Sequence, residues 1–288
     1  MASLKEIKGR ISSVEGTLKI TSAMKMVASA KLHKAQAAIE NMLPYDNQLH
    51  KIMMGLLSGD MKISTPLCFP HAQVKRVAII AIASNSSLCG GYNNNAIRHT
   101  IDAIKKYDDL PSDAKDVYVI GRKLDQGLSK LEGFNLIKDY LLLGDKPKFD
   151  TAKELATRLM DDYVKGRIDK VELVYMHFKS TSTQIPTCET YLPLSVKVDN
   201  EASGHAGYII EPGPEELLNT LIPDALCMKI YTVMLDAQAA EHAARTVAMQ
   251  TATDNGHDLL DELRILYNKG RQSAITSELL DIIGGSMQ

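Results

Sequence analysis

The chain has 288 residues, of which 45% are hydrophobic and 24% are charged, an ordinary composition for a soluble globular protein of one large or two modest domains. The formal net charge of −2 argues against a general nucleic-acid binder. No run of 18 apolar residues is present, so we expect any membrane association to occur through partners.

The N-terminal region is expected to form one long helix. All ten prolines lie between Pro44 and Pro223, so both ends lack the residue that a helix interior tolerates worst. Apolar residues recur at intervals of three and four, as in a heptad seam: Leu4, Ile7, Ile11, Val14 and Leu18. This spacing predicts a helix from Ser3 to Leu43, which Pro44 ends or kinks before 45–57 resumes the helical pattern.

The middle of the chain has a different period. The apolar run 77–83 predicts a strand buried on both faces, followed by a turn at 84–91 and a helix capped by Asn93 or Asn94 that reaches Tyr107. Further strands and helices are expected to alternate: strands at 116–121, 170–179 and 187–194, and helices at 122–131 and 149–165. This alternation predicts a mainly parallel sheet in a Rossmann-like α/β domain inserted at 75–210.

The C-terminal region predicts a second long helix, from Pro214 to Ile283, with a bend or restart at Pro223. Its seam keeps the same alternation: Leu226, Ile230, Val233, Ala237, Ala240, Ala244, Val247 and Thr251. Such a helix spans about 100 Å, so much of it must project from the head. The N-terminal helix is the expected antiparallel partner for part of its length, and the C-terminal helix outruns it by roughly 20–25 residues. We therefore expect an α/β fold in which residues 1–58 and 212–288 form an antiparallel coiled coil.

The two helices differ in charge. Residues 1–34 carry seven Lys/Arg and two Glu, whereas residues 254–281 carry six Asp/Glu and three Lys/Arg. Either the two solvated faces complement each other, or the basic face slides against an acidic partner.

Enzyme chemistry is weakly supported. The loop 84–91 follows a strand, where a phosphate cradle would lie, but it lacks the Gly-x-Gly-x-x-Gly spacing. Cys89 has no protease signature around it, and His242 follows Glu241 without a His-Glu-x-x-His motif. We predict no catalytic, cofactor or metal site. A nucleotide-binding enzyme with a helical dimerisation arm, or a coiled-coil scaffold, remain the alternatives.

Three stretches carry a resemblance to a known family. Residues 10–32 (Arg-Ile-Ser-Ser-Val-Glu-Gly-Thr-Leu-Lys-Ile-Thr-Ser-Ala-Met-Lys-Met-Val-Ala-Ser-Ala-Lys-Leu) closely resemble the first helix of the rotary ATP synthase γ subunit. The turn Leu88-Cys-Gly-Gly-Tyr-Asn93 resembles that family's loop after the first strand. Residues 243–255 and 267–285 resemble its long C-terminal helix and signature, so the likeness spans essentially the whole chain.

The resemblance implies a central shaft inside a ring of three α and three β subunits, with the head on the ε subunit and the membrane c-ring. Ion-driven rotation of the c-ring would turn the shaft and force the catalytic β sites through open and closed states for ATP synthesis or hydrolysis, with no catalytic site on this chain. It also implies contact or coupling roles towards β for seven residues: Met24, Lys25, Arg245, Arg271, Gln272, Thr276 and Glu278. Ile210 and Glu211 match a segment near the c-ring.

Some positions depart from the family pattern. The family commonly has Asp-Arg/Lys-Gly where this chain has Asn85-Ser86-Ser87, which puts a charged contact from that loop in doubt. Gly270 replaces a usual alanine, and we expect it to loosen the helix by up to ~1 kcal/mol. The four cysteines form no Cys-x-x-Cys motif, and no transit peptide precedes the first helix. A bacterial version is implied, at the cytoplasmic face of the inner membrane.

Overall fold

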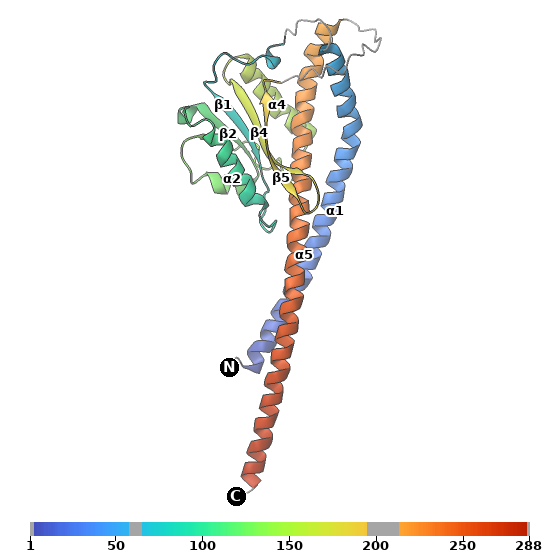
Figure 1. The fold of residues 1–288 in the computed structure, drawn as a ribbon, viewed down its shortest axis with the longest axis vertical. Coiled ribbons are helices and arrows are strands. Elements are labelled where there is room, and N and C mark those ends of the chain that lie inside the picture. Colours follow the sequence, from blue (N-terminus) through green and yellow to red (C-terminus); the bar gives the residue numbers. More distant parts are fainter. Residues whose placement is uncertain (1–2, 58–64, 195–212, 287–288) are drawn as a thin grey trace.

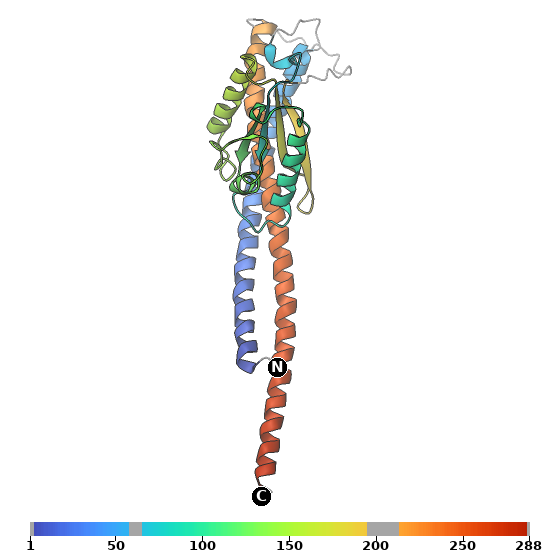
Figure 2. The ribbon, with the colours of Figure 1, turned by 90° about the vertical axis from the view of Figure 1, so that its left-hand side faces the viewer.

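The computed structural model describes residues 3–57, 65–194 and 213–286. Two long helices, α1 (Leu4–Leu57) and α5 (Pro214–Ser286), run side by side in opposite directions (Figure 1). We call this pair the shaft and residues 65–194 the head domain. The head domain lies beside the part of the shaft that is remote from both termini (Figure 2). The predicted coiled coil with an inserted α/β domain is therefore confirmed.

The N-terminal seam packs against α5, as its spacing predicts. Its members are partly or fully buried on an otherwise exposed stretch of helix: Leu4, Ile7, Ile11, Val14 and Leu18. Farther along α1, Leu32 and Ala35 form a small core with Ala239 and Ala243 of α5. The alanines let the two backbones approach closely, so the shaft is thin at this level.

The C-terminal helix was predicted to pair with the N-terminal helix for part of its length, but the first part of its seam does not face α1. Its first members pack into the head domain instead: Leu226, Ile230, Val233 and Ala237. Ala240 and Ala244 join the core on the other face of the sheet. Here α5 has two apolar faces because it packs on the head domain and on α1 at once. The spacing of the apolar residues on one face of α5 therefore does not show whether that face packs on the head domain or on α1.

Neither helix is ended by its proline. Pro44 lies inside α1, which continues to Leu57, and Pro223 lies inside α5, which is assigned as one helix. A proline removes one backbone hydrogen bond, and packing of the flanking turns offsets that loss, since Leu49 and Ile222 beside the prolines are buried. Within the described chain, no helix combines the length and apolar content that a bilayer crossing would need.

Glycines of α5 accommodate leucines of α1. A Cβ added to Gly256 would lie 2.6 Å from Cδ2 of Leu18, and one added to Gly270 would lie 3.1 Å from Cδ2 of Leu4. Gly270 therefore leaves room for Leu4 to pack against α5.

Two glycine substitutions should separate helix propensity from packing. Gly16 has nothing within 4 Å of an added Cβ. We expect Gly16→Ala to stabilise the chain by about 0.5–1 kcal/mol, because alanine restricts the unfolded backbone. Gly256→Ala has the same backbone benefit but displaces Leu18, so it should be at least about 1 kcal/mol less stable than Gly16→Ala. Urea unfolding of the two variants checks this, and equal stabilisation would show that Leu18 repacks freely.

The head domain contains a five-stranded sheet of order β3-β2-β1-β4-β5. The strands are β1 (Val77–Ile82), β2 (Lys115–Ile120), β3 (Asn135–Ile137), β4 (Lys170–Phe178) and β5 (Gln184–Leu192). β1 to β4 are parallel, and β5 is antiparallel to β4. The helices are α2 (Tyr92–Lys105), α3 (Arg122–Leu128) and α4 (Phe149–Val164), with short 3₁₀ turns at Pro66–Cys68 and Ser112–Ala114. The mainly parallel sheet is confirmed.

Three details differ from the prediction. β3 was not expected, because three residues show no period. β5 begins at Gln184, earlier than the predicted 187, and includes Pro186 on an edge strand, where a missing N–H is tolerated. Asn93 does not cap α2, because the N-cap residue is Gly91. The side-chain amide oxygen of Asn93 instead accepts hydrogen bonds from the backbone N–H (3.2 Å) and the hydroxyl (2.8 Å) of Ser84.

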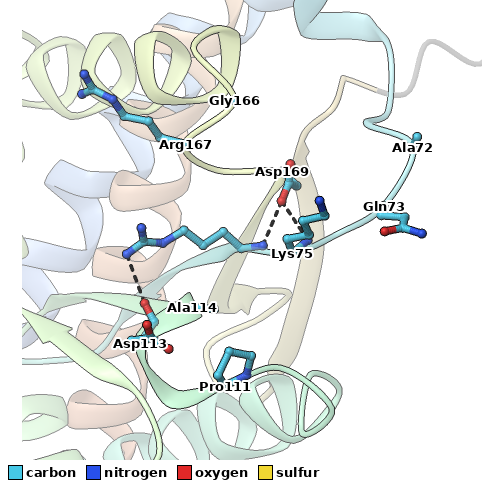
Figure 3. Close-up of a pocket in the computed structure, with 10 residues that line it drawn as sticks. Ala72, Gln73, Lys75, Pro111, Asp113, Ala114, Gly166, Arg167 and Asp169 are labelled. Atoms are coloured by element: carbon cyan, nitrogen blue, oxygen red, sulfur yellow. Dashed lines mark hydrogen bonds between the residues drawn. The ribbon is translucent and has the colours of Figure 1, made fainter.

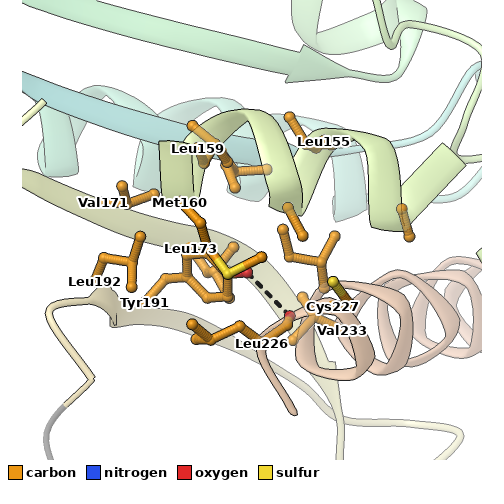
Figure 4. Close-up of a cluster of buried hydrophobic side chains, with 14 of the residues drawn as sticks. Leu155, Leu159, Met160, Val171, Leu173, Tyr191, Leu192, Leu226, Cys227 and Val233 are labelled. Carbon is orange, nitrogen blue, oxygen red and sulfur yellow. Dashed lines mark hydrogen bonds between the residues drawn. The ribbon is translucent and has the colours of Figure 1, made fainter. Parts of the chain in front are cut away.

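The larger core of the head domain is completed by the shaft. Leu155 and Leu159 of α4 pack over Leu173 of β4, and α5 closes the layer with Leu226 and Val233 (Figure 4). The hydroxyl of Tyr191 donates a hydrogen bond of 3.0 Å to the backbone carbonyl of Leu226, as Figure 4 also shows. The domain limits predicted from the sequence therefore cut through one continuous core.

Candidate functional site

Met24 of α1 and Arg245 of α5, two of the predicted contact residues, line one cavity of about 260 Å³ where the shaft meets the head domain. The α1 wall is largely apolar and includes Met24 and Val27, whereas the α5 wall is polar and includes Glu241, His242 and Arg245. Ser86 and Asp145 from two loops of the head domain complete the lining. The cavity thus joins three separate parts of the fold.

Arg245 is buried and connects α5 to the loop after β1. Its guanidinium donates to the backbone carbonyl of Ser87 and, at 2.9 Å, to the hydroxyl of Ser86. It also pairs with the Glu241 carboxylate at 2.6 Å, one helical turn away, and the side chains are only 9% and 10% exposed. In this chain the loop Asn85-Ser86-Ser87 therefore offers a hydroxyl and a backbone carbonyl as acceptors for an arginine of the shaft.

Burial perturbs the titration of the groups around this arginine. It raises the pKa of Glu241 above its ordinary value, although the bond from Arg245 acts in the opposite direction. Burial, assisted by the positive charges of Lys31 and Arg245 and opposed by Asp145, lowers the pKa of His242 to about 4. His242 is therefore neutral at physiological pH. Its Nδ1 atom is buried without a hydrogen-bond partner.

This histidine should make the chain less stable in mild acid. A pKa of about 4 in the folded state, against 6.5 for the unfolded chain, means that the unfolded state binds more protons between these values. Stability from His242 is full above pH 6.5 and is lost as the pH falls towards 4, by at most about 3 kcal/mol. We expect His242→Gln to lose this part of the pH dependence of the urea midpoint. The difference between the two chains isolates His242 from Glu241, whose raised pKa acts with the opposite sign. Parallel pH profiles would contradict the assignment.

Lys25 lies in a polar layer of the shaft. Its ammonium donates to the amide oxygen of Gln250 at 2.6 Å, and Gln250 in turn donates to Asp254 at 2.7 Å. One turn away, the hydroxyls of Thr21 and Thr253 bond across the two helices at 2.9 Å. Polar pairs at seam positions fix the register of two helices better than they stabilise them.

The remaining predicted β-contact residues lie beyond the end of α1. Leu4 packs beside Gly270, so α5 from Arg271 to Ser286 extends past its partner, at the lower end of Figure 1. This overhang is shorter than the 20–25 residues expected. Its predicted contact residues are all exposed: Arg271, Gln272, Thr276 and Glu278. Several large apolar side chains of the overhang are exposed too, among them Ile275, Leu279 and Leu280 at 48%, 54% and 63%.

The structure thus brings Met24, Lys25 and Arg245 to one level of the shaft and places the other four residues about six turns or more farther along α5. Ile210 and Glu211 lie outside the described residues. The sequence did not identify Ser86, Ser87 and Glu241 as partners of Arg245. The i, i+4 spacing of Glu241 and Arg245 was the available signal for one of them.

The loop 84–91, considered as a phosphate cradle, faces the shaft. Open parallel sheets bind ligands outside the carboxyl ends of their strands, where this loop lies. Here Arg245 bonds to Ser86 and Ser87, and an added Cβ on Gly90 would lie 3.7 Å from Ala248. The helix α5 therefore occupies the space outside the carboxyl ends of the strands, where a nucleotide would bind.

A wider depression of about 690 Å³ lies at the opposite edge of the sheet, near the amino ends of the strands (Figure 3). Its charged groups largely bond within the protein. The Asp169 carboxylate accepts hydrogen bonds of 2.8 Å from the backbone N–H groups of Lys75 and Arg76, and the Arg76 guanidinium donates to the carbonyl of Asp113 at 3.1 Å. These contacts fasten the starts of β1, β2 and β4 to one another.

Comparisons with known proteins agree with the geometry. The family model described as ATP synthase matches residues 3–287. The ATP synthase gamma chain of Phocaeicola vulgatus is 52% identical over 290 residues, covering 100% of both chains, and that of Parabacteroides distasonis is 46% identical, covering 99% of both.

Solved structures share the fold at low sequence identity. A chain of the Euglena gracilis mitochondrial ATP synthase (OSCP/F1/c-ring, rotational state 3) has a TM-score of 0.62 at 16% identity, covering 99% of this chain and 93% of that chain. A chain of the Tetrahymena thermophila central stalk/c-ring structure has a TM-score of 0.52 at 21% identity, covering 81% of this chain and 99% of that chain. With the full-length match to the curated relatives, the shaft and its overhang are accounted for: the chain belongs to the family of ATP synthase gamma chains.

Proposed function

We propose that this chain is the central rotor shaft of a bacterial F-type ATP synthase, and that it couples ion-driven rotation of the c-ring to conformational cycling of the β sites. The observation that carries the proposal is the overhang of α5, a single helix with exposed apolar and polar side chains that extends past α1. A helix of this kind suits the inside of a closely fitting ring of subunits.

In this proposal an α3β3 ring surrounds the overhang and the adjoining part of the shaft. The outer face of α1 at the level of Met24 supports such a contact, since Ile20 and Met26 are 62% and 63% exposed. Exposed apolar groups at one level of a helix are typical of a contact surface. Met24 and Lys25 would meet the β subunits there. Arg245, which is 8% exposed, would support this surface from behind.

Arg271, Gln272, Thr276 and Glu278 would contact β along the overhang. The opposite end of the shaft, with the head domain, would rest on the ε subunit and the c-ring, where Ile210 and Glu211 would contribute. The complex would place this chain at the cytoplasmic face of the inner membrane. Torque arises because an asymmetric shaft makes different contacts with each β site at each orientation, so it shifts their open and closed populations.

Reconstitution tests the proposal directly. Matched α and β subunits are assembled with and without this chain, and steady-state ATPase activity is measured. We expect a stoichiometric complex whose turnover exceeds that of α and β alone by about tenfold or more. A chain that neither joins the complex nor changes turnover would refute the proposal.

Calorimetry of the chain alone tests the competing nucleotide-binding function. Since α5 covers the carboxyl edge of the sheet, titration with ATP or NAD should release no heat of binding. Saturable binding of either nucleotide would favour an enzyme with a helical arm.

A further inference from the structure

One short stretch of α5 is bonded to the head domain from several directions. Asp236 lies where α5 passes the end of β4. Its carboxylate accepts a hydrogen bond of 2.9 Å from the backbone N–H of Phe178 and lies 2.7 Å from Nδ1 of His177. The Asp236 side chain is 16% exposed. This carboxylate therefore bonds two consecutive residues at the end of β4 from a partly desolvated position.

The next two residues bond to other parts of the head domain. The backbone carbonyl of Ala237 accepts a hydrogen bond of 3.0 Å from the buried hydroxyl of Tyr92, at the start of α2. The amide of Gln238 donates a bond of 2.9 Å to the backbone carbonyl of Asp145, in the loop before α4. Three consecutive residues of α5 thus contact three separate segments.

The fourth residue faces the other helix. Ala239 is fully buried and packs with Leu32 and Ala35 of α1. Successive residues of an α-helix are about 100° apart around its axis, so four of them cover the whole circumference. At this level α5 is enclosed by the head domain and α1. It cannot turn about its own axis without breaking bonds in several directions at once.

We propose that Asp236 is a positioning residue that locks the rotation of α5 about its own axis relative to the head domain. Its carboxylate makes two of the bonds in this ring of contacts. The role in coupling rests on the proposed function. Torque passing between the head domain and the shaft would rotate α5 about its own axis relative to the head domain, and the bonds of Asp236 prevent that rotation.

The variants separate the lock from general stability. Asp236→Ala removes both bonds, whereas Asp236→Asn keeps an oxygen for the N–H of Phe178 and serves as the conservative rescue. Lys229→Ala is the matched control, because it removes another α5 contact with the sheet, the ion pair with Glu189 at 3.0 Å. That pair is half-exposed and should contribute little.

The first readout uses the chain by itself. Nitroxide labels are introduced at the exposed positions Lys130 in the head domain and Val247 on α5 as unnatural amino acids, which leaves the four free cysteines unlabelled. Pulsed EPR then gives the distribution of distances between the labels. We expect Asp236→Ala to broaden it by roughly twofold, Asp236→Asn to restore most of the wild-type width, and Lys229→Ala to leave it unchanged.

The second readout uses the assembled complex. With the lock lost, we expect ATP hydrolysis to persist while the ions transported per ATP fall to about half. A merely structural role would lower assembly and hydrolysis without changing that ratio. If Asp236→Ala does not fold, Tyr92→Phe removes the bond to Ala237 with the ring retained, and should also broaden the distribution.

The outcomes distinguish the two proposals. Unchanged distance distributions in Asp236→Ala and Tyr92→Phe, or an unchanged ratio of ions to ATP in a broadened variant, overturn the locking role in coupling. If the wild-type chain does not assemble with α and β, but Asp236→Ala still broadens the distance distribution of the chain alone, the lock is supported and the rotor function is refuted.

Discussion

Replacing Arg271 and Gln272 together by alanine is expected to lower the ATPase activity of the assembled complex by about tenfold. The two side chains are exposed on the overhang, so they are free to bond a partner. A hydrogen bond to a charged group contributes about 1.5–3 kcal/mol, and about 1.4 kcal/mol corresponds to a factor of ten in rate. The measurement is steady-state hydrolysis by the reconstituted complex, together with ion transport driven by ATP.

The same double substitution should leave the chain folded. Exposed residues away from caps and buried networks change the free energy of unfolding by less than about 0.5 kcal/mol. Lys269→Ala is the control, since it removes one positive charge from an exposed position two residues earlier. If Lys269→Ala reduces activity as much as the double substitution does, net charge and not a specific contact is responsible, and the assignment to Arg271 and Gln272 fails.

Gly121→Ala should be the most destabilising single change in the head domain among those considered. Gly121 follows β2 with φ +109°, and an added Cβ would lie 2.2 Å from the carbonyl oxygen of Ala83. That oxygen belongs to the backbone at the end of β1, which cannot move without disturbing the neighbouring loop and its bonds to Arg245. We expect a loss of at least about 3 kcal/mol, from conformational strain together with overpacking.

Gly133→Ala provides the matched control. Gly133 has a similar φ of +102°, yet nothing lies within 4 Å of an added Cβ. Gly133→Ala should lower the free energy of unfolding by the conformational strain alone, about 1–2 kcal/mol. Urea unfolding of both variants gives the comparison. Equal losses would mean that the end of β1 yields to the new methyl group, and the close approach would then be structurally unimportant.

Much of this fold is predictable because its elements carry strong local signals. The seam from Leu4 to Leu18 repeats over many turns, and a long repeat leaves little doubt about helix. The run 77–83 reads as a strand because a buried parallel strand is apolar on both faces, and β1 is indeed fully buried. A single proline such as Pro44 is a weak signal for the end of a helix, because the packing of a helix of about fifty residues outweighs the loss of one hydrogen bond.

The errors come from choices that only tertiary structure makes. The stretch from Leu226 to Ala244 has helical spacing whichever neighbour it meets, so the sequence alone could not assign it to the head domain. Asn93 is a good N-cap residue by type, but Ser84 is a nearby competing partner that becomes visible only in the folded turn. The bonds of Arg245 to Ser86 and Ser87 join residues about 160 apart, and nothing local in the sequence indicates them.

The site was accessible only through family resemblance. Taken by themselves, Met24 looks like a core residue and Glu278 like a solvated charge. The exposed position of Glu278 and the cavity beside Met24 are compatible with contact roles, which the proposed variants will test.

The pairing of the first helix with the last also constrains how the chain is made. Leu18 and Gly256 meet although roughly 240 residues separate them, so at 5–20 residues per second the seam of α1 waits roughly 10–50 s during synthesis for its partner. The part of α5 that completes the head-domain core, from Leu218 to Ala237, leaves the ribosome before the part that pairs with the N-terminal half of α1. Closure of the coil then proceeds from Ala239 towards Gly270. Leu4, among the first residues translated, is among the last to be covered.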